Sequence, residues 1–392
     1  KYHGADGPIR ISQMKDAVHP ICHVFLKGCD QAGYQRSDDF NGAQFEGAGI
    51  YDVNTRNGQR SSSSFEYLHP ALARKNLTIE HNVLVDRVLF DGERRAIGVS
   101  VTQEGVVRRF MANREVILCA GAVDSPKLLQ LSGVGDSALL TKHGIATVNE
   151  LPAVGRNLQD HLCVSFYYRA NVKTLNDEMR PLLGKLKLGL QYLLTRKGPL
   201  AMSVNQSGGF FKGSEREAQP NLQLYFNPLS YRIPKSSKAN LEPEPYSKIR
   251  LNALSTQKDI DEVIQGCELV RKIMGSPALK EITVEEISPG PQVASREDFL
   301  QYFREQSGSI YHLCGSCAMG DDPRTSVVDA RLRVHGMAGL RVVDASIFPN
   351  ITSGNINAPT MMVAEKGADM ILEDAAAQGA REAEVADWAS AA

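Results

Sequence analysis

The alternation of apolar and polar residues predicts where most of the strands lie. Asn76–Asp91 alternates in this way and is rich in β-branched residues, which fits two strands. Ala96–Gln103 and Val106–Ala112 predict a hairpin that turns at Glu104-Gly105. The short apolar run Glu115–Ala120 is typical of a buried strand. Asn221–Phe226 and Leu340–Val343 predict two more strands, far apart in the sequence.

Apolar residues that recur with helical spacing predict the helices. This spacing is found near Val18–Ala32, Leu182–Arg196 and Thr256–Met274. Another helix is expected to begin at Ser125-Pro126 and end before Ser132, since proline is favoured in a first turn. A last helix is predicted from Ala358 to Leu372, followed by a frayed, Ala/Glu-rich tail.

The distribution of these elements predicts an interleaved mixed α/β architecture. Residues from about 70 to 160 and from 312 to 375 show β-then-α alternation. The block between them lacks this alternation and instead has amphipathic helices with a strand-like stretch between them. Leu151–His161, a loop that contains Pro152 and Gly155, is a natural crossover between the two. We therefore expect one domain assembled from separate segments, with a substrate-binding cap of antiparallel sheet and helices inserted into it.

Composition and charge narrow the functional classes. The 392 residues are 42% apolar and 23% charged, with 33 glycines, as in an ordinary globular protein. A net charge of -1 gives no reason to expect nucleic acid as a partner. No apolar run reaches the length of a membrane span, and no secretory segment is visible. The odd number of cysteines, seven, predicts free thiols and a cytoplasmic location, with which peripheral attachment to the inner membrane is compatible.

The candidate chemistry lies in the C-terminal part of the chain. His312 stands in a loop rich in glycine and cysteine, and Asn355 precedes the last predicted helix. A histidine base and a hydrogen-bonding amide are groups that alcohol oxidation needs. Cys314 and Cys317 form a CxxC, but the sequence has no second CxxC and no paired histidines at ligand spacing, so no metal is expected.

Three motifs in this order resemble those of the glucose–methanol–choline (GMC) oxidoreductases, and the resemblance covers almost the whole chain. They are Gly121-Ala122-x-x-Ser125-Pro126 with Ser132-Gly133-Val134-Gly135, Leu151-Pro152-x-Val154-Gly155-x-Asn157-Leu158-x-Asp160-His161, and His312-x-x-Gly315-x-Cys317-x-Met319-Gly320 with Asp344 and Asn355-x-Asn357-x-Pro359-Thr360. Within the family, the sequence most resembles the choline-dehydrogenase-like bacterial alcohol dehydrogenases.

The resemblance implies an FAD-dependent enzyme that oxidises a primary alcohol to an aldehyde by hydride transfer to flavin N5. It makes His312 the base and Asn355 its partner across the substrate hydroxyl; His161 is expected to be structural. The residues expected to contact FAD are Val85, Ala120, Asp344, Ala345, Asn357, Pro359 and Thr360. The residues expected to line the substrate pocket are Asn205, Gln206 and Phe210.

By the same resemblance, a Rossmann-like FAD-binding domain comprises residues 71–160 and 312–375, and 161–311 form the cap. Residues 1–70 are shared between the two domains, and 376–392 form a flexible tail. The GxGxxG segment that grips the FAD pyrophosphate is not present, and the stretch near Lys248–Ser255 is shorter than usual. We expect that residues are missing at both places, with natural truncation as the alternative.

Several alternatives stay open. The electron acceptor is either a quinone-type carrier or O₂, so dehydrogenase and oxidase are not distinguished. A hydroxynitrile lyase on the same scaffold is disfavoured by the asparagine at 355 and by the lack of a secretory segment. A third reading is a non-catalytic fragment that cannot hold FAD.

Overall fold

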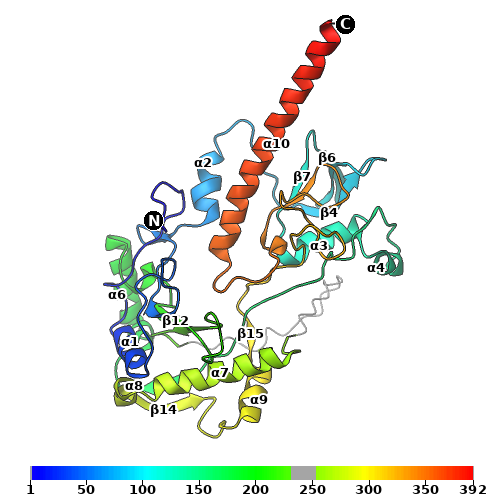
Figure 1. The fold of residues 1–392 in the computed structure, drawn as a ribbon. Helices are drawn as coiled ribbons and strands as arrows, with labels where there is room; N and C mark the ends of the chain where they lie inside the picture. Colours follow the sequence, from blue (N-terminus) through cyan, green and yellow to red (C-terminus); the bar gives the residue numbers. More distant parts are fainter. Residues whose placement is uncertain (1, 231–252, 392) are drawn as a thin grey trace. The chain divides into compact units, whose positions relative to one another are not determined.

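The computed structural model describes residues 2–230 and 253–391, and it confirms the mixed α/β class (Figure 1). The described residues form two compact units, the first of residues 2–77, 163–230 and 253–308, the second of residues 78–162 and 309–391. The short stretch expected near Lys248–Ser255 lies mostly outside the described residues.

The first unit is built on a three-stranded antiparallel sheet with the order β1-β12-β13. Its strands are β1 (Gly47–Ile50), β12 (Ser207–Phe211) and β13 (Leu222–Phe226), the last of which was predicted. Two of the predicted helices, α1 (Ile21–Gln31) and α7 (Gln257–Met274), share a buried apolar cluster with this sheet.

The longest of the remaining elements of the first unit is the predicted helix α6 (Leu182–Thr195). Strands β11 (Tyr167–Ala170) and β14 (Thr283–Ser288) pair antiparallel, as do β2 (Thr55–Arg56) and β3 (Gln59–Arg60). The other helices are η1 (Ser64–Leu68), α2 (His69–Ala71), α5 (Leu175–Met179), η2 (Pro199–Ala201), α8 (Pro277–Ile282) and α9 (Arg296–Gln306). Strands β10 (Leu162–Cys163) and β15 (Gly308–Ser309) lie where the chain passes between the units.

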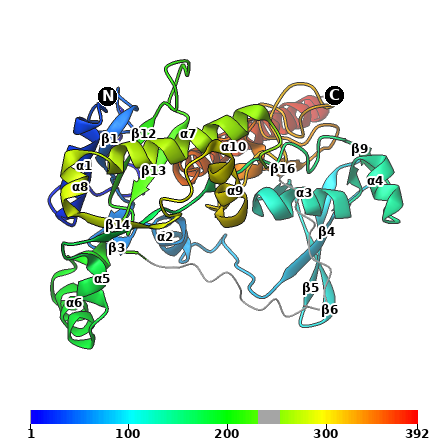
Figure 2. The ribbon, with the colours of Figure 1, turned by 90° about the horizontal axis from the view of Figure 1, so that it is seen from below.

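An antiparallel sheet with the order β4-β5-β6 belongs to the second unit (Figure 2). The predicted hairpin of β5 (Ala96–Gln103) and β6 (Val106–Met111) is confirmed. Its two turn residues, Glu104 and Gly105, both have positive φ, which matches the twist that tight hairpins require. The expectation of two strands in residues 76–91 was wrong, because only β4 (Leu84–Phe90) forms there.

A parallel pair of strands brings two distant segments together in the second unit. β7 (Val116–Leu118) pairs with β16 (Leu340–Val342), so both strands end at the same edge. Helix α3 (Gly121–Leu131) follows β7, and the short helix η3 (Ala345–Ile347) follows β16.

Helix α3 begins four residues before the predicted start, and Pro126 lies inside it. Proline lacks the N–H that would bond the carbonyl one turn earlier. The hydroxyl of Ser316 donates to that carbonyl, of Ala122, at 2.5 Å. A side chain from a distant loop therefore replaces the hydrogen bond that Pro126 cannot make, which local sequence could not reveal.

The second unit is completed by β8 (Val134–Gly135), α4 (Ser137–Lys142), β9 (Asn149–Glu150) and the long helix α10 (Asn357–Ala391). The expected helix end near Leu372 was wrong, since α10 continues through the Ala/Glu-rich stretch, whose residues are strong helix formers. Buried Arg341 joins strand and helix, because its guanidinium lies 2.7 Å from Glu115 and 2.6 Å from Asp374.

Candidate active site

The predicted base lies in a buried loop of the second unit. His312 is only 8% exposed, and its backbone N–H donates to Oδ1 of Asp160 at 3.0 Å. Beside these two residues in the sequence, Cys314 and Gln159 exchange both backbone hydrogen bonds. This antiparallel bridge fixes the loop that carries His312 against the crossover loop.

Asn355 and His312, 43 positions apart in the sequence, meet as the motif reading expected. Nδ2 of Asn355 lies 3.3 Å from Nε2 of His312. The asparagine is exposed, whereas the ring behind it is buried. The pair thus presents one ring nitrogen and one amide group to an accessible position, where a substrate hydroxyl could reach both.

The structure adds a third member to the site, His161. Its Nδ1 lies 3.0 Å from Nδ1 of His312, and the two rings meet edge to face with centroids 5.3 Å apart. Sequence reasoning had given His161 a structural role only. The bridge between Gln159 and Cys314 explains why His161 lies at the site, because antiparallel pairing sets His161 directly opposite His312. That pairing cannot be read from the motifs alone.

The contacts around the two rings are consistent with one arrangement of protons. The amide nitrogen of Asn355 can only donate, so Nε2 of His312 accepts and the proton of this ring lies on Nδ1. That N–H donates to Nδ1 of His161, whose own proton then lies on Nε2. A hydrogen bond between His161 and the Thr352 backbone favours a protonated ring nitrogen there, which agrees with this assignment.

Burial tunes both histidines toward their neutral forms. It lowers the pKa of His312 below its usual 6.5, and the nearby carboxylate of Asp160 opposes this shift. Burial also lowers the pKa of His161, assisted by His312 and opposed by Asp160. A neutral ring is the form that can accept a proton from a hydroxyl group.

The residues expected at the cofactor meet where the two parallel strands end. Asp344, after β16, accepts hydrogen bonds at one carboxylate oxygen from the Gly121 backbone at 2.9 Å and from the Ser125 hydroxyl at 2.5 Å. The Ser125 hydroxyl also receives the Ala120 backbone N–H at 3.0 Å, and Asp344 caps η3, which begins at Ala345. These hydrogen bonds hold the ends of the two strands together.

The N-terminus of α10 follows Asn355 after two residues. Asn357 is exposed, Pro359 and Thr360 are half-buried, and the first turn contains no acidic residue. Thr360 donates through its hydroxyl to the Ile356 carbonyl at 2.7 Å. The positive end of the helix dipole therefore faces an accessible position without a carboxylate of its own to neutralise it.

The other predicted ligand residues lie apart from this cluster in the chain. Val85 is on β4, half-buried against the core of the second unit. Asn205, Gln206 and Phe210 belong to the first unit. There, Gln206 accepts a hydrogen bond from the His19 backbone at 2.7 Å, and the tilted rings of Phe210 and Phe45 have centroids 4.1 Å apart. Their roles toward FAD and substrate remain predictions.

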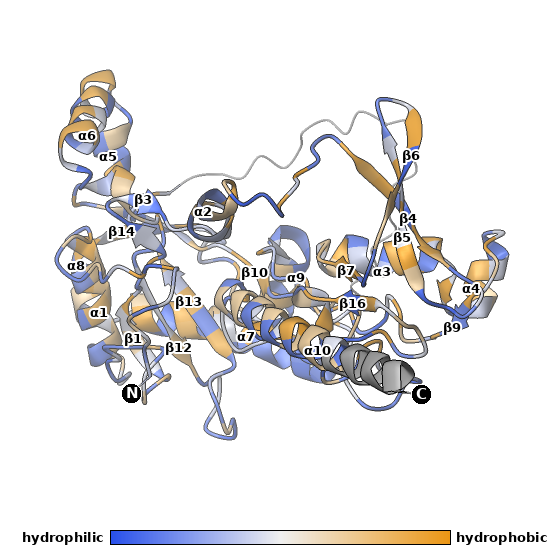
Figure 3. Ribbon diagram, turned by 90° about the horizontal axis from the view of Figure 1, so that it is seen from above, coloured by the Kyte–Doolittle hydropathy of each residue, from blue (hydrophilic) through white to orange (hydrophobic). Residues whose placement is uncertain are grey.

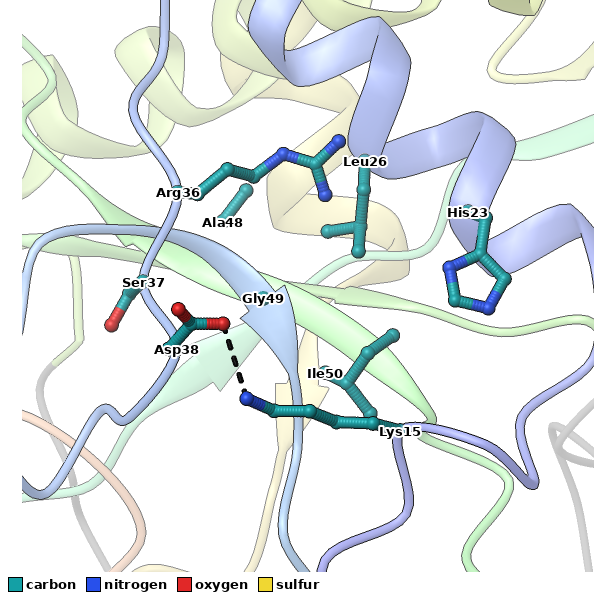
Figure 4. Close-up of a pocket in the computed structure, with 9 residues that line it drawn as sticks. All are labelled: Lys15, His23, Leu26, Arg36, Ser37, Asp38, Ala48, Gly49 and Ile50. Atoms are coloured by element: carbon teal, nitrogen blue, oxygen red, sulfur yellow. Dashed lines mark hydrogen bonds and ion pairs between the residues drawn. The ribbon is translucent and has the colours of Figure 1, made fainter.

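A pocket of about 180 Å³ lies in the first unit (Figure 4) and contains none of the predicted site residues. Two of its cationic side chains have acidic partners, Lys15 with Asp38 at 3.1 Å and Arg36 with Asp30 at 2.7 Å. Because these charges are already paired, the pocket offers no strong position for an anionic ligand.

The CxxC cysteines are buried beside the site. Burial raises the pKa of Cys314 to about 11 and also raises that of Cys317, so neither is a thiolate at neutral pH. Among residues 2–230 and 253–391, no group of acidic, histidine and cysteine side chains is arranged to hold a metal ion.

Similarity to known proteins extends over most of the chain. Residues 2–163 and 235–364 match the N- and C-terminal parts of the GMC oxidoreductases. An oxygen-dependent choline dehydrogenase from Escherichia coli is 38% identical over 94% of this chain and 71% of that protein. Formate oxidase from Aspergillus oryzae has 25% identity and a TM-score of 0.86 over 95% of this chain and 73% of that one. Pyridoxine 4-oxidase from Mesorbium loti has 26% identity and a TM-score of 0.79 over 94% and 72%.

Proposed function

The chain belongs to the GMC oxidoreductase family, flavoproteins that act on CH–OH groups, and we propose that it oxidises a primary alcohol to an aldehyde. The observation that supports this most is the contact between Nε2 of His312 and the amide of Asn355, at 3.3 Å. The substrate is a small-molecule alcohol, and an electron acceptor is required.

His312 removes the hydroxyl proton. Its Nε2 accepts that proton while Nδ1–H donates to His161, so the imidazolium that forms has a hydrogen-bond partner at the buried nitrogen. The carboxylate of Asp160, beside the His312 backbone, stabilises the positive charge. His161 acts through His312 and is therefore a positioning residue.

Asn355 stabilises the oxygen that loses the proton. Its amide N–H donates to the developing alkoxide, and it is already directed at the place where the hydroxyl and the base meet. A donor that is fixed before the reaction needs no rearrangement as the charge forms. Asn355 also aligns the hydroxyl, but it does not accept the proton. Replacing Asn355 should therefore slow flavin reduction less than replacing the base His312.

The residues at the two strand ends and at the start of α10 fit FAD. Ala120, Asp344 and Ala345 form a strand-end edge of the kind at which α/β proteins bind cofactors. The first turn of α10, with Asn357, Pro359 and Thr360, suits the electron-rich pyrimidine end of the flavin, because no acidic residue lies in it. When bound, FAD supplies the two-electron acceptor for the hydride that leaves the alcohol carbon.

The acceptor that reoxidises the flavin is a quinone-type carrier or O₂. With a quinone-type carrier as the acceptor, peripheral attachment to the inner membrane is expected. Among the described residues, no helix is long and apolar enough to cross a bilayer.

Replacement of the base tests the proposal. In FAD-loaded protein, His312→Ala should slow anaerobic flavin reduction by a primary alcohol by roughly 10²–10⁴-fold, the contribution of a general base. FAD content should not change, and His143→Ala, at an exposed histidine, should reduce flavin at the rate of the parent. An unchanged single-turnover rate in His312→Ala would refute the assignment.

A further inference from the structure

Helix α6 exposes a continuous row of leucines. Six of its seven leucine side chains are between 58% and 79% exposed: Leu182, Leu183, Leu186, Leu190, Leu193 and Leu194. At 100° per residue they occupy an arc of about 120° on one side of the helix. Figure 3 shows α6 with this apolar colouring at the surface of its unit. Such a contiguous exposed apolar row is a mark of an interaction surface.

The opposite side of α6 holds the helix in place within the first unit. Leu188 is buried, and the hydroxyl of Tyr192 donates to the Gly58 carbonyl at 3.1 Å. The helix ends at Thr195 and is capped by Arg196, which has left-handed backbone angles. The guanidinium of Arg196 lies over the Tyr192 ring at 5.0 Å. The leucine row is therefore directed outward by fixed contacts behind it.

Basic side chains flank the row, and the acidic side chains nearest in the sequence are Asp177 and Glu178 of α5. Residues 180–198 contain five basic side chains and no acidic one: Arg180, Lys185, Lys187, Arg196 and Lys197. All five are exposed, and none forms an ion pair within the described ranges 2–230 and 253–391. By helical geometry, Lys187 borders one edge of the leucine arc, and Lys185 lies beyond the other edge.

We infer that α6 is the element by which this protein contacts the surface of an anionic phospholipid bilayer. Fourteen residues of helix span about 21 Å, too short to cross the bilayer core, so α6 lies in the plane of the interface. Leucines on one face and lysines at its edges are the composition of interfacial helices. The inference specifies the membrane association proposed above and does not depend on the catalytic assignment.

A second copy of the chain fits this surface less well. If two α6 faces packed against each other, the lysines of both helices would meet lysines, because α6 itself has no acidic residue to pair with them. Anionic head groups complement the same lysines while the acyl region receives the leucines. Charge complementarity therefore favours lipid.

Vesicle co-sedimentation of the FAD-loaded protein tests the inference. The parent protein should bind phosphatidylcholine vesicles that contain phosphatidylglycerol, and bind phosphatidylcholine alone more weakly. A triple variant, Leu186→Gln with Leu190→Gln and Leu193→Gln, should lose about tenfold or more of the affinity, since three apolar side chains leave the interface. The double variant Lys185→Gln with Lys187→Gln should lose the preference for the anionic lipid.

A matched control replaces three exposed leucines of the second unit: Leu84→Gln, Leu131→Gln and Leu372→Gln. This variant should bind as the parent does. Equal binding by the α6 triple variant and the parent would overturn the assignment to α6, and a parent that binds no vesicle would overturn the membrane association as well. If the parent protein forms a dimer without lipid and the α6 triple variant does not, the partner of α6 is a second copy of the chain and not a bilayer. Flavin reduction is measured on the same samples, so failure of catalysis is seen separately.

Discussion

The hydrogen bond between His161 and His312 selects the ring nitrogen of His312 that accepts a proton, and removing it should expose that role. His161→Leu takes away the acceptor that lies 3.0 Å from Nδ1 of His312. The buried Nδ1–H is then left without a partner. Moving its proton to Nε2 avoids the unsatisfied donor, but it blocks the nitrogen that faces Asn355.

The size of the effect follows from this loss. A buried donor without a partner costs about 1–3 kcal/mol. The same free energy lowers the population of the productive tautomer, and with it the rate constant for flavin reduction, by roughly 5-fold to 150-fold. This loss is smaller than the loss expected for His312→Ala, since in His161→Leu the base itself is still present.

The control is His161→Asn, whose side-chain oxygen can take the place of Nδ1 as an acceptor. We expect His161→Asn to reduce flavin within about threefold of the parent rate, because a neutral hydrogen bond of ~1 kcal/mol is largely retained. Single-turnover reduction measures the rates, and nitrogen NMR of labelled histidine reports the tautomer of His312. Equal losses in both variants, or a His161→Leu protein with the parent tautomer and rate, would refute the reasoning.

Two further predictions concern charge. Asp160→Asn keeps an acceptor for the His312 backbone N–H but removes the charge that opposes the lowered pKa of His312. The pH at which the rate falls to half in acid should therefore move to a still lower value than in the parent protein. A midpoint that moves to higher pH would contradict this prediction. Arg341→Leu should lower the free energy of unfolding by about 3 kcal/mol, because a buried ion-pair network is broken. Lys127→Leu, at an exposed pair, should change it by less than about 0.5 kcal/mol in the same denaturant titration.

Much of the fold could be predicted because its signals are local. The hairpin at Glu104-Gly105 was predicted from a two-residue turn between alternating strands, and α7 was predicted from helical spacing. The errors arise where a distant group decides the outcome. The start of α3 was misplaced because Pro126 marks a helix start in isolation, whereas Ser316 satisfies the carbonyl that a proline inside a helix leaves free.

The site shows the same division between local pattern and long-range pairing. His312 and Asn355 could be proposed from motifs, since each residue type suits its task in the proposed reaction. His161 could not, because its proximity to His312 follows from the register of two segments about 150 residues apart. The tautomer that makes His312 a base depends on that register. A sequence can therefore name the acid–base residue, while the group that makes its lone pair available is identified only once the fold is known.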